Sequence, residues 1–131
     1  MPGQPMASAH RMRRDRGAAT AELVAVLPGL VAVVLALAWL LSLGIAQVRT
    51  VDAARETARA LARGDEDSAA VGRGEQVGPT GTSIAISRGA TQVVATATVE
   101  VHGPGGLLGF LPGARLHASA TAAAEDAAAA P

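Results

Sequence analysis

The stretch that decides the fold is LVAVLPGLVAVVLALAWLLSLGIA, which runs from Leu23 to Ala46. Its 24 residues include no charged side chain. An α-helix rises about 1.5 Å per residue, so this one would be about 36 Å long and could cross a bilayer core of about 30 Å. The stretch therefore predicts a membrane-spanning helix.

Two other interpretations of this stretch are weaker. A cleaved secretory signal peptide has an apolar core of only about 7–15 residues, which is shorter than the stretch seen here. A helix that is apolar on every face could also be buried in a soluble domain. It would then need partners all round, and a chain of 131 residues has few to offer.

The charges before the apolar stretch predict its orientation. Arginine-rich flanks stay on the cytoplasmic side of a membrane. We therefore expect residues 1–17 to form a disordered cytoplasmic leader, with the C-terminal part outside, as in a single-pass protein of the cell membrane. A single acid, Asp15, stands among the four arginines of this flank, which are Arg11, Arg13, Arg14 and Arg16.

The composition of the chain argues against an enzyme. It carries 11 basic and 11 acidic side chains and no cysteine, so no net charge attracts nucleic acid and no disulfide or thiolate metal site can form. Trp39 and Phe110 are its only aromatic residues, although aromatic rings usually line ligand pockets. We expect no catalytic site, no metal and no cofactor.

The helical pattern continues beyond the apolar stretch. Apolar residues recur at three- and four-residue steps, and two opposite-charge pairs, Asp52 with Arg55 and Glu56 with Arg59, stand three residues apart. The sequence therefore predicts a transmembrane and extended helix over residues 18–63.

Beyond this helix the apolar residues change from a helical spacing of three to four residues to the two-residue alternation of a strand. Gly64 is a suitable helix stop, because glycine readily adopts the left-handed conformation at a helix C-terminus. Alternating residues over 83–87 and 93–101 predict a hairpin, and 116–122 predict a third strand. The fold class is therefore α+β, a long N-terminal transmembrane helix extending into a small antiparallel β head. The segments after the helix are a loop over 64–81, the β-rich external head over 82–122 and a disordered tail over 123–131.

One charged side chain stands at the start of the apolar stretch. The junction reads Arg16-Gly17-Ala18-Ala19-Thr20-Ala21-Glu22-Leu23, and Glu22 would cost about 2.5–3.5 kcal/mol if it lay near a bilayer centre. The cost is smaller at the interface, and an acid is favourable at a helix N-terminus. A cut after Gly17 would make Ala18 the new N-terminus and Glu22 the fifth residue.

This arrangement resembles the class III signal sequences of type IV pilins, which combine a basic leader, a glycine, a glutamate at position five and a long apolar helix. Residues 13–47, which include Arg16-Gly17, Glu22 and Leu27-Pro28, resemble the TadE-like proteins of the tight-adherence (Flp) pilus. The likeness is to the compact versions found in high-GC Gram-positive bacteria. It implies a minor pilin, a pseudopilin or a tip subunit that acts in pilus assembly or adhesion.

The resemblance also implies partners and residue roles. A prepilin peptidase would cut between Gly17 and Ala18, and Glu22 would then pair with the new amine during helix assembly. Other pilin subunits, an assembly ATPase, inner-membrane platform proteins and membrane lipid would be the partners, without nucleic acid. Pro28 cannot donate a hydrogen bond to Val24, so backbone chemistry and the resemblance both predict a kink there.

One rival function stays open at this level. The chain could remain uncut at Gly17 and act as a signal-anchored envelope protein with a small partner-binding external domain. Metal binding is not indicated, because the three histidines lack metal-ligand spacing, although His102 and His117 could approach each other across strands. The histidines are His10, His102 and His117.

Overall fold

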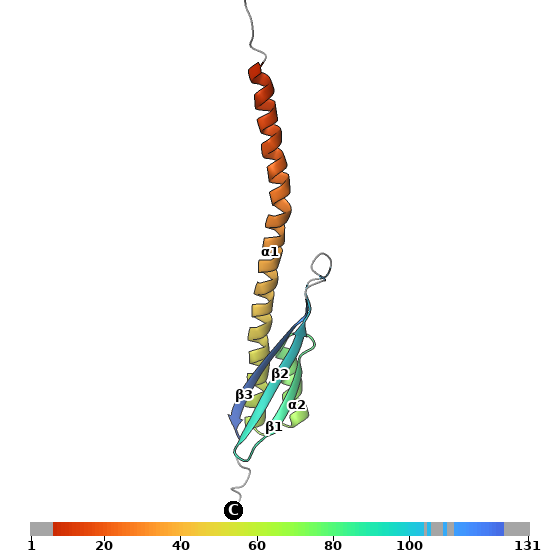
Figure 1. The fold of residues 1–131 in the computed structure, drawn as a ribbon. Coiled ribbons are helices and arrows are strands. Elements are labelled where there is room, and N and C mark those ends of the chain that lie inside the picture. The colour runs from red at the N-terminus through yellow and green to blue at the C-terminus, as the bar shows by residue number, and fades with distance from the viewer. Residues whose placement is uncertain (1–6, 104, 106–108, 110–111, 125–131) are drawn as a thin grey trace, which may run out of the picture. The chain divides into compact units, whose positions relative to one another are not determined.

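The computed structural model describes residues 7–103, 105, 109 and 112–124. These residues form two helices and one three-stranded antiparallel sheet, which confirms an α+β fold with a long N-terminal apolar helix (Figure 1). The chain divides into two compact units, the first ending at Ala38 and the second beginning at Trp39. The elements are α1 (Ala7–Ala62), α2 (Asp67–Val77), β1 (Ser83–Arg88), β2 (Gln92–Val101) and β3 (Ala114–Ala123).

Helix α1 begins earlier than the sequence pattern predicts. The expectation of a disordered leader over residues 1–17 is wrong for residues 7–17, which are helical, while residues 1–6 lie outside the described part. The reason is local composition, because the segment after Pro5 consists mostly of alanine, arginine and methionine, which have high helix propensity. Gly17 therefore lies inside a helix.

The C-terminal end of α1 follows the prediction closely. The helix ends at Ala62, and Gly64 has a φ of 85°, the left-handed conformation that glycine adopts most easily. The amide of Asp65 donates to the carbonyl of Ala60 at 3.1 Å, and that of Gly64 donates to Leu61 at 3.0 Å. These two bonds make a Schellman motif, which satisfies carbonyls that the helix end would otherwise leave free.

Helix α2 corrects the expectation of a loop over residues 64–81. Asp67 lies in its first turn, where a carboxylate is favourable beside the positive end of the helix dipole. Gly74 is buried, and a Cβ atom there would lie 2.9 Å from the carbonyl oxygen of Ala53 and closer still to the Thr57 hydroxyl. Glycine is unfavourable in a helix interior, but at this position it lets α2 lie against α1.

The sheet has the order β1-β2-β3 with antiparallel neighbours throughout. The predicted hairpin is confirmed, with Ser83 opposite Thr98 in the β1-β2 register. The predicted third strand is confirmed and is longer than expected, since β3 includes Ala123, the first residue of the expected tail. The rest of that tail lies outside the described residues, apart from residue 124.

The buried face of the sheet packs on the C-terminal part of α1. Along β2 every second residue is buried, as the two-residue alternation predicts. Most of the contacting side chains are alanines, which allow close approach between helix and sheet. One cluster joins Ala53, Ala54 and Ala97 with Ile84, Ala118 and Ala120, and the other joins Ala60, Leu61, Ala70 and Val93 with Ile86 and Ala124.

Candidate membrane-anchoring and processing segment

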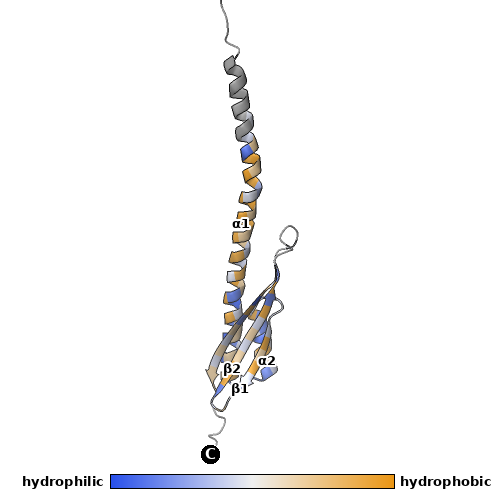
Figure 2. Ribbon diagram, viewed as in Figure 1, coloured by the Kyte–Doolittle hydropathy of each residue, from blue (hydrophilic) through white to orange (hydrophobic). Residues whose placement is uncertain are grey.

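Helix α1 exposes most of its large apolar side chains from Leu23 to Val48. Leu23 is 72% exposed and Leu41 is 67% exposed, although burial of such side chains is worth about 1.5–3 kcal/mol each. Figure 2 shows this apolar stretch along α1. Within the described residues, α1 is long enough and apolar enough to cross a membrane, judged by its length and composition. A bilayer would remove this apolar surface from water.

The four residues singled out from the sequence all lie on α1. Gly17 is exposed, and a Cβ atom added there would meet nothing within 4 Å, so packing inside the chain does not require a glycine. Glu22 is exposed and follows Ala18 by four residues, about one turn of α1.

Pro28 lies inside α1, which continues through it as one helix. The proline has no amide hydrogen, so one intrahelical hydrogen bond is lost at that turn. The kink expected there stays a prediction.

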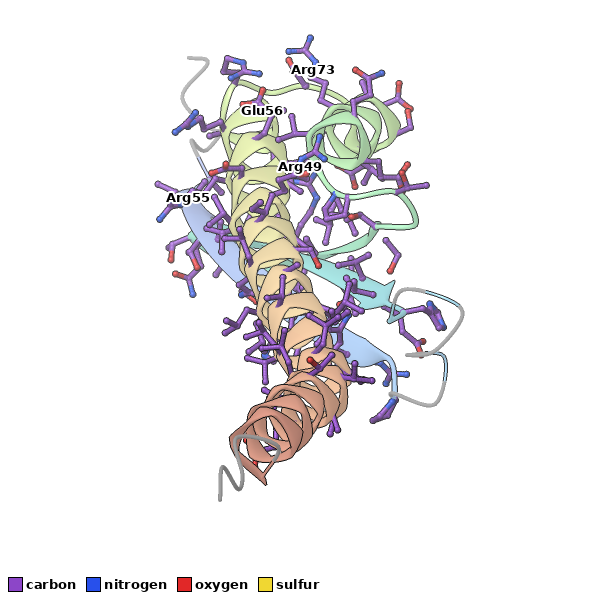
Figure 3. All side chains as sticks on the ribbon, turned by 90° about the horizontal axis from the view of Figure 1, so that it is seen from above. Arg49, Arg55, Glu56 and Arg73 are labelled. Carbon is purple, nitrogen blue, oxygen red and sulfur yellow. The ribbon has the colours of Figure 1, made fainter. Side chains whose placement is uncertain are left out.

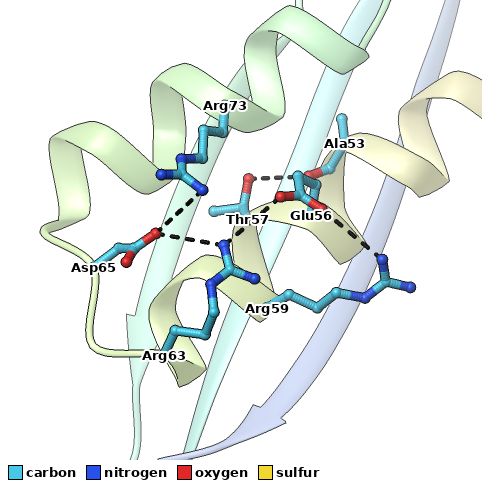
Figure 4. A network of polar contacts seen from close by, with 7 residues as sticks. All are labelled: Ala53, Glu56, Thr57, Arg59, Arg63, Asp65 and Arg73. Atoms are coloured by element: carbon cyan, nitrogen blue, oxygen red, sulfur yellow. Dashed lines mark hydrogen bonds and ion pairs between the residues drawn. The ribbon is translucent and has the colours of Figure 1, made fainter.

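A network of charged side chains surrounds the turn between α1 and α2 (Figure 4). Arg63 lies 3.8 Å from Glu56 and 3.4 Å from Asp65, and Arg73 lies 3.6 Å from Asp65. The predicted pair of Glu56 with Arg59 is formed at 3.9 Å. All five side chains are at least partly exposed, so each pair contributes about 0–1 kcal/mol and the network is a structural feature of the turn.

Two contacts suggested by the sequence are not formed. Asp52 and Arg55 are both exposed and make no ion pair within the described part, because water solvates such charges almost as well as a partner does.

His117 lies opposite Thr98 in the β2-β3 register, whereas His102 follows the end of β2 and lies 3.7 Å from Glu100. The two histidines therefore do not face each other. The described residues contain no group of three or more histidine or acidic side chains placed to hold a metal.

Sequence reasoning missed the position of Arg49. It is exposed and follows Ile45 and Leu41 at four-residue steps, so it adjoins apolar residues of α1. The sequence shows this spacing, but the uncharged stretch ends at Ala46, and that boundary separates Arg49 from the apolar residues that it adjoins.

Comparison of the chain with family models, curated proteins and solved structures finds no match.

Proposed function

We propose that this chain is a TadE-like minor pilin or pseudopilin of a tight-adherence (Flp, type IV) pilus. It is inserted in the membrane through α1, cut between Gly17 and Ala18 by a prepilin peptidase, and then takes part in pilus assembly or adhesion. The observation that carries the proposal is the exposed apolar surface of α1, which directly follows the Arg16-Gly17 to Glu22 sequence.

An exposed apolar helix suits two environments in turn. In the bilayer its side chains face lipid, and after removal of the basic leader it can leave sideways and pack against the same helices of neighbouring subunits. The helical spacing of Ala18 and Glu22 supports a role for the carboxylate in that step. A new amine at Ala18 would lie within reach of Glu22 in its own or an adjacent subunit, and the low dielectric between apolar helices would strengthen the pair.

The outer face of the sheet supports a position of the head outside the bilayer core. On β3 the exposed positions alternate with half-buried ones, and four of them are the polar residues Arg115, His117, Ser119 and Thr121. Thr96 of β2 lies 3.0 Å from Ser119, oxygen to oxygen, on this face. A polar sheet face is stable against water and unsuited to the bilayer interior.

The rival function, an uncut signal-anchored envelope protein, is favoured by one observation. Helix α1 runs through Gly17 and Ala18 without a break, so a peptidase has to unwind it to reach the peptide bond. Glycine in a helix interior costs about 0.5–1 kcal/mol relative to alanine, which makes the unwinding easier at Gly17 than at neighbouring positions.

The mass of the mature protein distinguishes these two functions. In a host with a functional prepilin peptidase we expect a species of residues 18–131, with or without an added methyl group. Gly17→Leu should block the cut, because the side chain keeps the protease carboxylates from the scissile carbonyl. Gly29→Leu is the matched control, since Gly29 lies in the same helix with nothing within 4 Å of an added Cβ atom, and it should be cut normally. A wild-type protein that keeps residues 1–17 in that host would establish the rival function.

The role of Glu22 is tested after the cut. Glu22→Ala should be cut yet poorly incorporated, so its recovery in sheared surface fibres should fall several-fold, whereas Glu22→Asp should retain most of the incorporation because it keeps the charge. Equal recovery of Glu22→Ala and wild type would show that assembly does not require the Glu22 carboxylate.

The orientation is tested separately with reporters. Because the arginines flank the N-terminal side of the apolar stretch, a reporter active outside the cytoplasm should work when fused after the last residue, Pro131. A reporter active only in the cytoplasm should fail at the same position. The opposite result would place the head in the cytoplasm and exclude both functions.

A further inference from the structure

Helix α2 contributes little apolar surface to the core of the second unit. Its buried residues are Ala70 and Gly74, which have the smallest side chains. Strand β2, by contrast, buries larger apolar side chains, among them Val93 and Val99, each 2% exposed. Regions with few buried apolar contacts open at a lower cost in free energy than the core of a domain does. Helix α2 should therefore detach from the unit more easily than β2 does.

The helical conformation of α2 is itself weakly stabilised. Gly72 and Gly74 lie inside the helix, where glycine is less favourable than alanine. Glu66 stands at the N-cap position and makes no side-chain hydrogen bond to the helix. An ion pair between Asp67 and Arg88 joins α2 to the sheet, but both side chains are more than half exposed, so water competes with this contact. Detachment of α2 therefore breaks few strong interactions.

Glycines in the left-handed conformation stand on both sides of α2. Gly64 and Gly81 each have a φ of 85°, and an added Cβ atom at either residue would meet nothing within 4 Å. Hinges are positions at the ends of elements whose backbone absorbs a change of direction, and glycine has the widest range of φ and ψ. The two glycines are therefore suited to act as hinges for the segment between them, residues 65–80.

The surface beneath α2 is apolar. A Cβ atom at Gly74 would contact Cδ1 of Ile84, and Ile86 packs against the cluster that includes Ala70. Both isoleucines belong to β1, an edge strand of the sheet. Figure 3 looks along α1 and shows α2, which carries Arg73, at the side of this helix. Without α2 the two isoleucines would be exposed, whereas the contacts of α1 with β2 and β3 would remain.

We propose that residues 65–80 form a flap, hinged at Gly64 and Gly81, which opens over β1 while α1 and the sheet stay folded. In the closed state Ile84 and Ile86 are half-buried. In the open state they form an apolar surface on the edge strand, so any contact that uses them depends on the flap. This inference goes beyond the proposed pilin function. It holds whether or not the chain is cut at Gly17, and on whichever side of a membrane the head lies.

Hydrogen–deuterium exchange of the full-length chain in detergent, resolved to single amides by NMR, tests the flap. The amides of α2 should exchange together, at least about tenfold faster than those of β2 between Ala95 and Val99. Low concentrations of urea should accelerate the β2 amides and leave the α2 amides nearly unchanged, because opening of the flap exposes little surface. Equal protection of α2 and β2 would overturn the proposal. Exchange that slows steadily from the ends of α2 toward its middle would also overturn it, because that pattern indicates fraying.

Two truncations on β2 provide a matched pair. Val93 packs in the cluster that contains Ala70 of α2, whereas Val99 lies opposite Leu116 of β3. Val93→Ala and Val99→Ala should each accelerate exchange in β2 by about tenfold, because each removes buried methyl groups. Exchange in α2 should be faster in Val93→Ala and should keep the wild-type rate in Val99→Ala. Equal exchange of α2 in the two variants would overturn the proposal, since the contact between Ala70 and Val93 would then not hold a separate flap.

Discussion

Gly74 illustrates how the absence of one side chain shapes the second unit. It lies in α2 where three elements meet, since an added Cβ atom would contact Thr57 and Ala53 of α1 and Ile84 of β1. Thr57 is fully buried and satisfies its hydroxyl by donating to the carbonyl of Ala53 at 2.9 Å. The hydroxyl and carbonyl cannot move away without losing that bond, so the space above them must stay empty.

Gly74→Ala should therefore destabilise the second unit. We expect a loss of about 1–3 kcal/mol, the usual range for overpacking a close contact. The measurement is denaturant unfolding of the full chain in detergent, followed by circular dichroism.

Gly72→Ala is the matched control in the same helix. An added Cβ atom at Gly72 meets nothing within 4 Å, so this change should stabilise α2 by about 0.5–1 kcal/mol through higher helix propensity. If both alanine variants were stabilised alike, the close packing of α2 on α1 would be wrong.

At the scale of elements, the turn between α1 and α2 decides where the chain reverses. The Schellman motif at Gly64 ends α1, and α2 begins at Asp67 after a very short connection. The backbone amide of Asp65 donates a hydrogen bond to the carbonyl of Ala60 at the helix end. Its carboxylate forms ion pairs with Arg63 and Arg73. The backbone motif contributes more to stability than these exposed ion pairs do, because it gives hydrogen-bond donors to carbonyls at the helix end.

Gly64→Ala should destabilise this turn by about 1–2 kcal/mol, the approximate cost of the left-handed conformation for a residue with a Cβ atom. Gly64→Asn should cost less, because asparagine tolerates that conformation better than alanine does. Thermal unfolding of the two variants beside wild type measures the difference. Identical stability of alanine and asparagine variants would mean that the turn relaxes to another backbone conformation.

At the scale of the whole molecule, the β head depends on a helix that the sequence pattern assigns to a different segment. The buried positions of β2 contact α1 between Ala53 and Leu61, and Gln47 donates its side-chain amide to the carbonyl of His117 at 3.3 Å. A three-stranded sheet without that helix exposes one apolar face. The folded unit therefore includes the C-terminal part of α1.

A fragment of residues 65–131 should consequently fail to fold, whereas a fragment of residues 47–131 should fold cooperatively. The longer fragment keeps both small-residue clusters and leaves out most of the exposed apolar helix. Amide chemical-shift dispersion and thermal unfolding distinguish the two fragments. A cooperative unfolding transition for residues 65–131 would show that the sheet and α2 suffice as a core.

Much of the fold was readable from local patterns. The apolar helix, the stop at Gly64, the hairpin and the third strand follow from period, propensity and glycine conformation, which depend on neighbours along the chain. The spacing that places Ala18 and Glu22 on one helix face also followed from the sequence, because helix geometry alone determines it. Their roles in processing and assembly stay predictions.

Tertiary contacts decided the rest. Residues 67–77 carry glycines that locally favour a loop, and they become α2 because Gly74 allows close packing on Thr57 and Ala53. By itself the sequence determined which segments are helical, extended or apolar, since those properties are local. Which surfaces are buried together was decided by the tertiary structure, because burial depends on residues far apart in the chain.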